Sequence, residues 1–243
     1  MSLWWLWGGP ASDLPPTNTI RVNWPRLKSF EDTALGITGL VSAWPMSEDA
    51  GSAQCLDRVG GNQATVNGVT LGATGLLFED EATAASFDGV NDYLSIADAT
   101  NLDTTDTFSF FVVIDRTTTG TKHYLAHKGT GSWGLYVSAA DLLTLEEVGT
   151  ADIVASTATV DNAAHSVCVT KSGSTVKLYF DGIDVTGTVT NQTLANTATA
   201  LEIGRSQAAG DPFAGTMQWP LLFNVELTPA QVASLHVAFE FGE

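Results

Sequence analysis

Four residues with oxygen-bearing side chains are candidate ligands for a calcium ion. Asp88, Asn91 and Asp92 fall within the short stretch FDGVNDY, and Asp57 lies upstream in CLDRVGGN. A hard cation such as Ca²⁺ takes about six to eight oxygen ligands from carboxylates, amides and backbone carbonyls. The same residue types also favour tight turns, because Asp and Asn tolerate the backbone geometry of a hairpin. Turn formation is the simpler interpretation and a Ca²⁺ site is the alternative; the sequence indicates no other cofactor.

Three aromatic side chains are candidates for carbohydrate binding. Tyr124, Trp133 and Tyr136 flank the Gly-rich stretch HKGTGSWG, which could line a groove. An exposed aromatic ring stacks on a sugar face, but rings of this size more often belong to the core. Both interpretations stay open at this point.

The N-terminal segment carries the densest group of large apolar side chains. We predict that these residues dock onto another protein: Leu3, Trp4, Trp5, Leu6, Trp7 and Trp24. Tryptophan is strongly enriched among the residues that dominate binding energy at interfaces. Such a group left in water would promote aggregation, so it needs a partner surface. Docking on its own domain, or on a membrane without the help of nearby basic groups, are the alternatives.

Charge restricts the possible partners. The 243-residue chain has a formal net charge of −17. Residues 1–40 hold three basic and three acidic side chains, so the acidic excess lies entirely in the remainder. A body of this charge repels nucleic acid and anionic membranes, whereas cations, neutral glycans and basic protein surfaces remain possible partners.

The sequence shows no pattern typical of a signal peptide, and its cysteines are few, so we expect a protein made in a cytoplasm. The first basic residue is Arg21, and the apolar run before Gly8 is too short for a signal peptide. No stretch approaches the roughly 20 apolar residues of a membrane span. Cys55 and Cys168 are expected to be reduced and buried, and without a Cys/His cluster a zinc site is not expected.

Two segments differ in their expected structure. Residues 1–38 form a predicted extended arm, in which the prolines among residues 8–36 disfavour helices and central strands. Residues 39–243 form the predicted domain. Its one convincing helix start is LTPAQVASL, where Thr228 is the N-cap, Pro229 the first helical residue and Gln231 the partner in a capping box.

Short β-like runs fill most of the predicted domain. They are GLVSAWPM, AASFDG, DYLSIA, FSFFVVID, HYLAHK, WGLYVSA, LLTLEEV, IVASTATV, HSVCVTK, TVKLYFDG, ALEIGRS and GTMQWPLLFNV. Many strands separated by Gly, Asn and Asp turns predict an all-β sandwich or jelly roll. FSFFVVID is apolar on both faces and is therefore predicted to be a central strand, whereas TVKLYFDG alternates like a strand with one solvated face.

Four stretches, in this order, resemble the laminin G-like members of the concanavalin A-like lectin/glucanase superfamily. They are residues 84–102 (AASFDGVNDYLSIADATNL), 165–185 (HSVCVTKSGSTVKLYFDGIDV), 201–206 (LEIGRS) and 213–235 (FAGTMQWPLLFNVELTPAQVASL). The resemblance extends over residues 39–240 and leaves the arm outside. It implies an antiparallel two-sheet jelly-roll sandwich in which the two ends of the domain pair near one edge.

The resemblance includes enzymes, but the sequence argues against catalysis. Glycosidases of the laminarinase type place their carboxylates on one strand as Glu-x-Asp-x-x-Glu. The nearest pattern here is LEEVGTADI, with Glu146, Glu147 and Asp152. Adjacent glutamates on a strand point to opposite faces, and the Gly-Thr pair breaks the strand before Asp152. We therefore expect a non-catalytic protein, with a laminarinase-type glycoside hydrolase as an alternative.

Three functional hypotheses follow. The first is a phage virion surface protein, made in the host cytoplasm, which decorates a capsid or tail by docking its arm on a major capsid or tail protein. Its lectin-like domain would face outwards and bind host glycans. The second is a free extracellular carbohydrate-binding or adhesion module, and the third is the glycoside hydrolase. No nucleic acid and no membrane span enter any of them.

Overall fold

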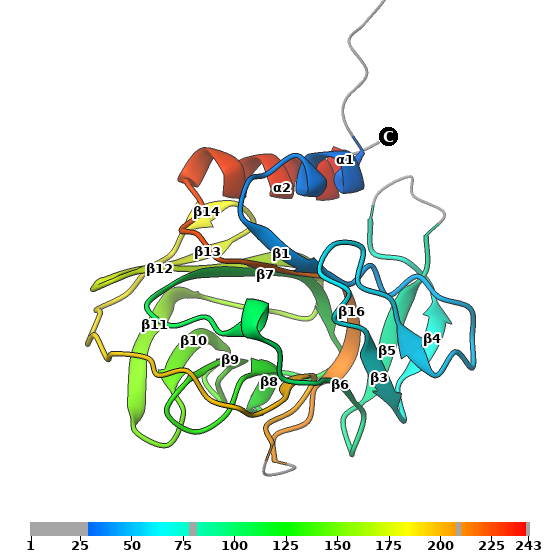
Figure 1. Cartoon of the computed structure of the whole chain (residues 1–243), viewed down its shortest axis with the longest axis horizontal. Coiled ribbons are helices and arrows are strands. Elements are labelled where there is room, and N and C mark those ends of the chain that lie inside the picture. The colour runs from blue at the N-terminus through cyan, green and yellow to red at the C-terminus, as the bar shows by residue number, and fades with distance from the viewer. Residues whose placement is uncertain (1–28, 78–81, 208–209, 242–243) are drawn as a thin grey trace, which may run out of the picture.

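The computed structural model describes residues 29–77, 82–207 and 210–241. Figure 1 shows two stacked β-sheets with the two α-helices of these residues against one of them. All strand pairs in this part of the chain are antiparallel. The predicted all-β sandwich with a short C-terminal helix is therefore confirmed.

Within the described ranges, each sheet has eight strands. Sheet A contains, in spatial order, β14 (Ile183–Asp184), β13 (Thr175–Phe180), β12 (Ala164–Ser172), β7 (Thr107–Arg116), β16 (Ala214–Phe223), β5 (Ala84–Asp88) and β4 (Thr70–Ala73), and β1 (Leu40–Ala43) also pairs with β16. Sheet B contains β11 (Ala151–Thr159), β10 (Leu142–Glu147), β9 (Trp133–Val137), β8 (His123–His127), β15 (Leu201–Ile203), β6 (Tyr93–Ile96), β3 (Ala64–Asn67) and β2 (Gln54–Cys55). The helices are α1 (Phe30–Leu35), a 3₁₀ turn (Thr100–Leu102) and α2 (Pro229–Phe241).

Strand β7 separates two hydrophobic cores. Phe108 and Phe110 pack between the sheets, whereas Phe111 and Val113 face the helices. The prediction of a central strand that is buried on both faces is thus confirmed. Because both faces of β7 are apolar, sheet A must be covered on both sides, by sheet B on one and by α1 and α2 on the other.

Helix α2 begins where its capping signal predicts. The backbone N–H of Thr228 donates to Gln231 Oε1 at 2.9 Å, and the Gln231 N–H donates to Thr228 Oγ1 at 3.3 Å. These two bonds satisfy amide groups that a helix start leaves free. Val232 and Leu235 then pack into the core between the helices and sheet A.

Two expectations were wrong, and both concern the face of sheet A that α1 and α2 cover. Residues 30–35 of the predicted irregular arm form α1, capped by Ser29, and Phe30 packs 5.8 Å from the Phe111 ring. Tyr179 of β13 is 2% exposed rather than solvated, because the helices cover this face of sheet A. Both corrections concern contacts with distant residues that the local pattern does not contain.

The cysteines and most of the strands agree with the sequence-based expectations. Cys55 and Cys168 are free and buried, as predicted. Every strand-like run of the sequence is found as a strand, but β2, β3, β4 and β14 were not predicted. These four are two to four residues long and lie at or next to sheet edges, where a hydrophobic pattern is too short to recognise.

Buried lysines fix the long connection between β14 and β15. Lys128 Nζ donates to Asp98 at 2.6 Å and to the carbonyls of Thr197 and Thr199 at 3.2 and 2.7 Å. Lys171 likewise donates to Asn191 Oδ1 at 2.7 Å. An ammonium group in the interior is tolerated only with such partners, so each lysine holds part of this connection in place.

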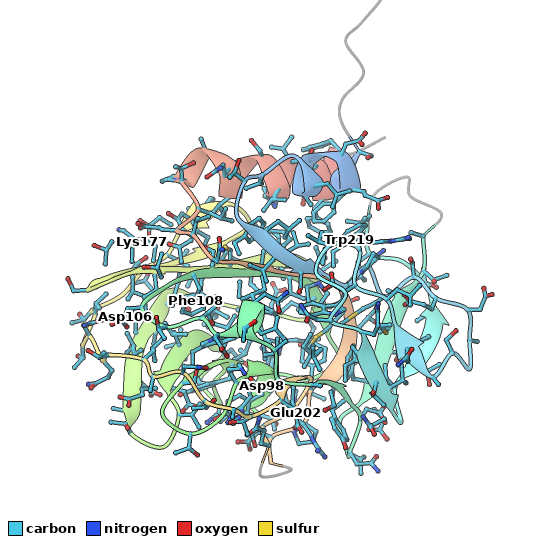
Figure 2. The ribbon with its side chains drawn as sticks, viewed as in Figure 1. Asp98, Asp106, Phe108, Lys177, Glu202 and Trp219 are labelled. Carbon is cyan, nitrogen blue, oxygen red and sulfur yellow. The ribbon has the colours of Figure 1, made fainter. Side chains whose placement is uncertain are left out.

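We expect Lys128→Met to lower the free energy of unfolding by about 2–4 kcal/mol, because Asp98 and two carbonyls lose their charged donor. The matched control is Lys177→Met. Lys177 pairs with Asp184 at 2.8 Å with both side chains 41% exposed, so its loss should cost about 1 kcal/mol or less. Figure 2 labels Asp98 and Lys177. Denaturant unfolding measures both values, and equal losses would contradict this account.

Candidate functional site

The outer face of sheet B carries a group of aromatic and acidic side chains. Leu125, Leu135 and Leu145 point into the core between the sheets. Tyr124 and Tyr136 therefore point outwards, since neighbouring residues on a strand face opposite sides. No helix of the described residues packs against this face (Figure 1).

Strand register brings these side chains together. Tyr124 of β8 is paired with Tyr136 of β9, and Glu146 of β10 is paired with Asp152 of β11. The tyrosine rings lie 5.3 Å apart between centroids, at an interplanar angle of 50°. We call Tyr124, Tyr136, Glu146 and Asp152 the tyrosine–carboxylate cluster.

Hydrogen bonds order this cluster. The Tyr124 hydroxyl donates to Glu146 Oε1 at 2.5 Å, and the Tyr136 hydroxyl donates to Asp152 Oδ1 at 2.6 Å. Burial raises the pKa of both hydroxyls, and the neighbouring carboxylates raise it further. Burial also raises the pKa of Glu146, although the Tyr124 hydroxyl and Lys122 act in the opposite direction. The tyrosines therefore remain protonated donors at neutral pH.

Lys122 covers the two rings. Its ammonium nitrogen lies 3.9 Å from the Tyr136 centroid and 4.5 Å from the Tyr124 centroid, within cation–π range. It also donates to the Tyr124 hydroxyl at 3.0 Å and lies 3.9 Å from Asp211 Oδ2. With this side chain above them, Tyr124 and Tyr136 are only 6% and 5% exposed.

His127 extends the site towards β15. Its ring lies 5.3 Å from Tyr124 in an edge-to-face arrangement, and its register partner is Glu202. Burial lowers the pKa of His127 to about 4, so the imidazole is neutral at neutral pH. Its Nδ1 is buried and has no hydrogen-bond partner among the described residues. Glu202, labelled in Figure 2, instead accepts from Arg205 Nε at 2.8 Å.

Gly134 makes room for the cluster. A Cβ at this position would lie 2.8 Å from Glu146 Oε1 and 3.1 Å from Tyr124 Cε1. Both side chains lean over the bare backbone of β9, which is what allows their hydrogen bond to form across this strand. The glycine is therefore part of the site although it has no side chain.

One of the predicted aromatic ligands belongs to the core. Trp133 has no exposed surface, stacks 5.0 Å from Phe108 and donates from Nε1 to Thr104 Oγ1 at 2.8 Å. As the first residue of β9 it lies on the inner face of sheet B, so it cannot stack on a ligand. Tyr124 and Tyr136, predicted alongside it, lie together on the outer face.

The predicted calcium ligands organise turns. Asp57 accepts backbone N–H bonds from four residues (Ala43, Val59, Gly60 and Asn62). Asp88 Oδ1 accepts from Val90 and Asn91, and Asp92 Oδ2 accepts from the Asp88 N–H at 2.9 Å. Among the described residues, no three His, Cys, Asp or Glu side chains are grouped closely enough to hold a metal ion. These contacts agree with the turn interpretation, and Ca²⁺ binding stays a prediction.

Other expectations concern the arm and the acidic stretch. The docking residues Leu3, Trp4, Trp5, Leu6, Trp7 and Trp24 lie outside the described residues.

In LEEVGTADI, Glu146 and Glu147 are consecutive residues of β10, paired with successive residues of β9, so they point to opposite faces of the strand as expected. Sequence reasoning missed the hairpin that pairs Asp152 with Glu146. It also missed Lys122 and His127. The Gly-Thr turn before Asp152 was the one available signal for the hairpin.

Comparison with known families agrees with the fold. The sequence profile of the Laminin_G_3 family, described as the concanavalin A-like lectin/glucanases superfamily, matches residues 88–233. This chain belongs to that family. The match includes the tyrosine–carboxylate cluster and ends within α2. A comparison with curated proteins gives no match.

Several solved structures share the fold. Sialidase of Trypanosoma rangeli in complex with sialic acid aligns with 83% of this chain and 33% of its own, at 15% identity and a TM-score of 0.60. Domain 4 of AbnA, a GH43 extracellular arabinanase of Geobacillus stearothermophilus in complex with arabinotriose, aligns over 81% and 98%, at 15% identity and a TM-score of 0.60. The binding domain of Paraclostridial Mosquitocidal Protein 1 aligns over 83% and 52%, at 12% identity and a TM-score of 0.60. The chain thus spans about a third of the sialidase.

In the described part of the chain, no helix has the length and apolar character that crossing a bilayer requires.

We expect Tyr124→Phe to raise the pKa of Glu146 further. The tyrosine hydroxyl donates to the ionised carboxylate and so stabilises the charged form, and its removal favours the protonated form. Carboxyl-carbon NMR during a pH titration measures this change. Tyr136→Phe is the control, because that hydroxyl donates to Asp152 instead and should change the Glu146 titration less. An unchanged Glu146 titration in Tyr124→Phe would contradict the assignment.

Proposed function

We propose that this protein is a non-catalytic carbohydrate-binding protein and that the outer face of sheet B is its binding site. The observation that carries the proposal is the tyrosine–carboxylate cluster. Two rings lie side by side there, with a carboxylate bonded to each hydroxyl. Support comes from the similar AbnA domain, whose structure was solved with arabinotriose.

The chemistry of the cluster suits a sugar. Aromatic faces pack against the C–H groups of a pyranose or furanose ring, and the two tyrosine faces become accessible when the Lys122 side chain moves away from them. Glu146 and Asp152 each use one oxygen for a tyrosine, and the other oxygen can accept a sugar hydroxyl. His127 Nδ1 adds a buried polar atom without a partner in the described structure. Apolar rings with a few well-placed polar groups are typical of small-molecule sites.

A non-catalytic role fits the arrangement of the carboxylates. Both Glu146 and Asp152 are engaged by tyrosine hydroxyls, and Asp152 lies on an edge strand of sheet B. We therefore favour binding over hydrolysis. A glycosidase is the alternative, and turnover of an oligosaccharide that Glu146→Gln abolishes would favour it.

We expect Tyr136→Leu to abolish or strongly weaken glycan binding, because it removes a stacking surface and the donor to Asp152. A glycan array probed with the full chain and with this variant measures the effect. The control is Phe241→Ala, whose side chain is 57% exposed on α2, on the far side of sheet A (Figure 1). Binding that survives Tyr136→Leu, or an array without any signal, would refute the proposal.

We also propose that the arm attaches this domain to a larger assembly, such as a phage capsid or tail, so that the protein lies on a virion surface. The support is the group of tryptophans in residues 1–24. The helix side, where the described chain begins, further exposes Leu35, Val237 and Phe241. Val237 and Phe241 line a cavity of about 570 Å³ there, which offers additional apolar contact area.

Replacement of Trp4, Trp5 and Trp7 by serine should prevent co-sedimentation of the full chain with capsid or tail particles assembled in the same cells, because the interface loses its largest apolar side chains. Glycan binding by the same variant is the control for folding. Undiminished incorporation of a correctly folded variant would remove the docking role.

A further inference from the structure

Lys122 lies over the two aromatic rings of the tyrosine–carboxylate cluster. Its ammonium nitrogen lies above both rings, at 3.9 and 4.5 Å from their centroids. Building on the proposed glycan function, we propose that the site takes a cationic amino sugar, whose ammonium group replaces that of Lys122. The lysine then acts as an internal occupant that the ligand displaces.

The charge of the site favours a cation. Glu146 and Asp152 belong to the cluster, and Asp211 lies 3.9 Å from the Lys122 nitrogen. Asp211 thus pairs with the Lys122 ammonium group, and Glu146 also attracts it, since Lys122 acts to lower the pKa of that carboxyl group. A cation over a tyrosine face gains electrostatic attraction that a neutral hydroxyl does not, and this gain grows as water is excluded. With Tyr136 only 5% exposed, the ring face is already largely shielded from water.

Lys122 is held less firmly than the buried residues Lys128 and Lys171. Lys128 and Lys171 have side chains that are 2% and 0% exposed, and both donate to backbone carbonyls. The Lys122 side chain is 31% exposed, and its partners are two ring faces, the Tyr124 hydroxyl and the Asp211 carboxylate at 3.9 Å. A flexible lysine stem can swing into solvent at the cost of one partly exposed ion pair with Asp211 and without breaking a bond to a backbone carbonyl, so Lys122 can leave where the other two cannot.

An amino sugar matches both parts of the site. Its ammonium group would take the place above Tyr124 and Tyr136, and its neighbouring hydroxyls would donate to the free oxygens of Glu146 and Asp152. The corresponding N-acetylated sugar has the same ring but no charge. The N-acetylated sugar therefore lacks the charge but has a larger substituent, whereas the glucose analogue has a small neutral hydroxyl at the same position and controls for size.

Calorimetric titration of the full chain tests this inference with three probes: a β-1,4-linked glucosamine hexamer, the matching N-acetylglucosamine hexamer and cellohexaose. We expect the glucosamine hexamer to bind about tenfold more tightly than the other two, a difference of about 1.4 kcal/mol. Tyr136→Leu should remove this preference although it leaves every charge in place.

Two lysine variants separate displacement from general attraction to an acidic protein. Lys122→Gln and Lys177→Gln each remove one positive charge, but Lys177 lies on sheet A, away from the cluster. We expect Lys122→Gln to tighten binding of the glucosamine hexamer about tenfold, because the ligand no longer competes with the lysine. Lys177→Gln should change it less than about twofold.

Three results would overturn the inference. Equal or tighter binding of the N-acetylated hexamer or cellohexaose would exclude a cation preference and leave the proposed glycan function intact. Equal effects of Lys122→Gln and Lys177→Gln would assign the gain to net charge. Absence of glucosamine binding in both the unmodified chain and Lys122→Gln would refute the cation site, and the glycan array would then decide separately whether the face binds other glycans.

Discussion

The apolar character of both faces of β7 determines how the rest of the molecule is arranged. Phe110 and Phe111 are neighbours on this strand and bury their rings in different cores, so sheet A cannot leave either side open to water. Sheet B covers one side, and α1 and α2 cover the other. Sheet B therefore keeps the one broad strand face that no helix of the described residues covers, and this is where the polar and aromatic side chains gather.

The site on that face depends on rigid strands and not on loops. Tyr124, Tyr136, Glu146 and Asp152 come from four consecutive strands, each side chain held by the register of its neighbours. Hydrogen bonds between hydroxyls and carboxylates then fix the rings, so little side-chain freedom would be lost on binding of the proposed glycan. Gly134 contributes by leaving space where any side chain would separate two of these residues.

Cations have two distinct roles in this acidic chain. Lys128 and Lys171 are buried and hold connections by donating to carbonyls, and their function is to stabilise the fold. Lys122 is partly exposed and lies over aromatic rings, where we propose that a cationic ligand takes the place of its ammonium group. The difference lies in the partners, because a carbonyl bonded to a buried ammonium has no substitute donor, whereas a ring face accepts any suitable cation. This contrast connects the stability of the domain to the proposed recognition of glycans.

Local patterns in the sequence were sufficient for the fold class and for the longer strands, but not for α1 or for the four short strands near the sheet edges. The apolar residues on both faces of FSFFVVID (residues 108–115) predicted the central strand, and Thr228 with Gln231 predicted the start of α2, because both features depend on residues within a few positions of each other. The same patterns could not show that Trp133 lies in the core and Tyr136 on the outer face. Which face of a strand is buried depends on how the sheet packs, and the sequence of the strand does not contain this. The Gly-Thr turn is a local signal for the hairpin of β10 and β11, but only the tertiary structure decided the register that places Asp152 beside Glu146 and the position of Lys122 over the tyrosines. Those contacts depend on strand register and loop position, which are set by packing across the whole sheet.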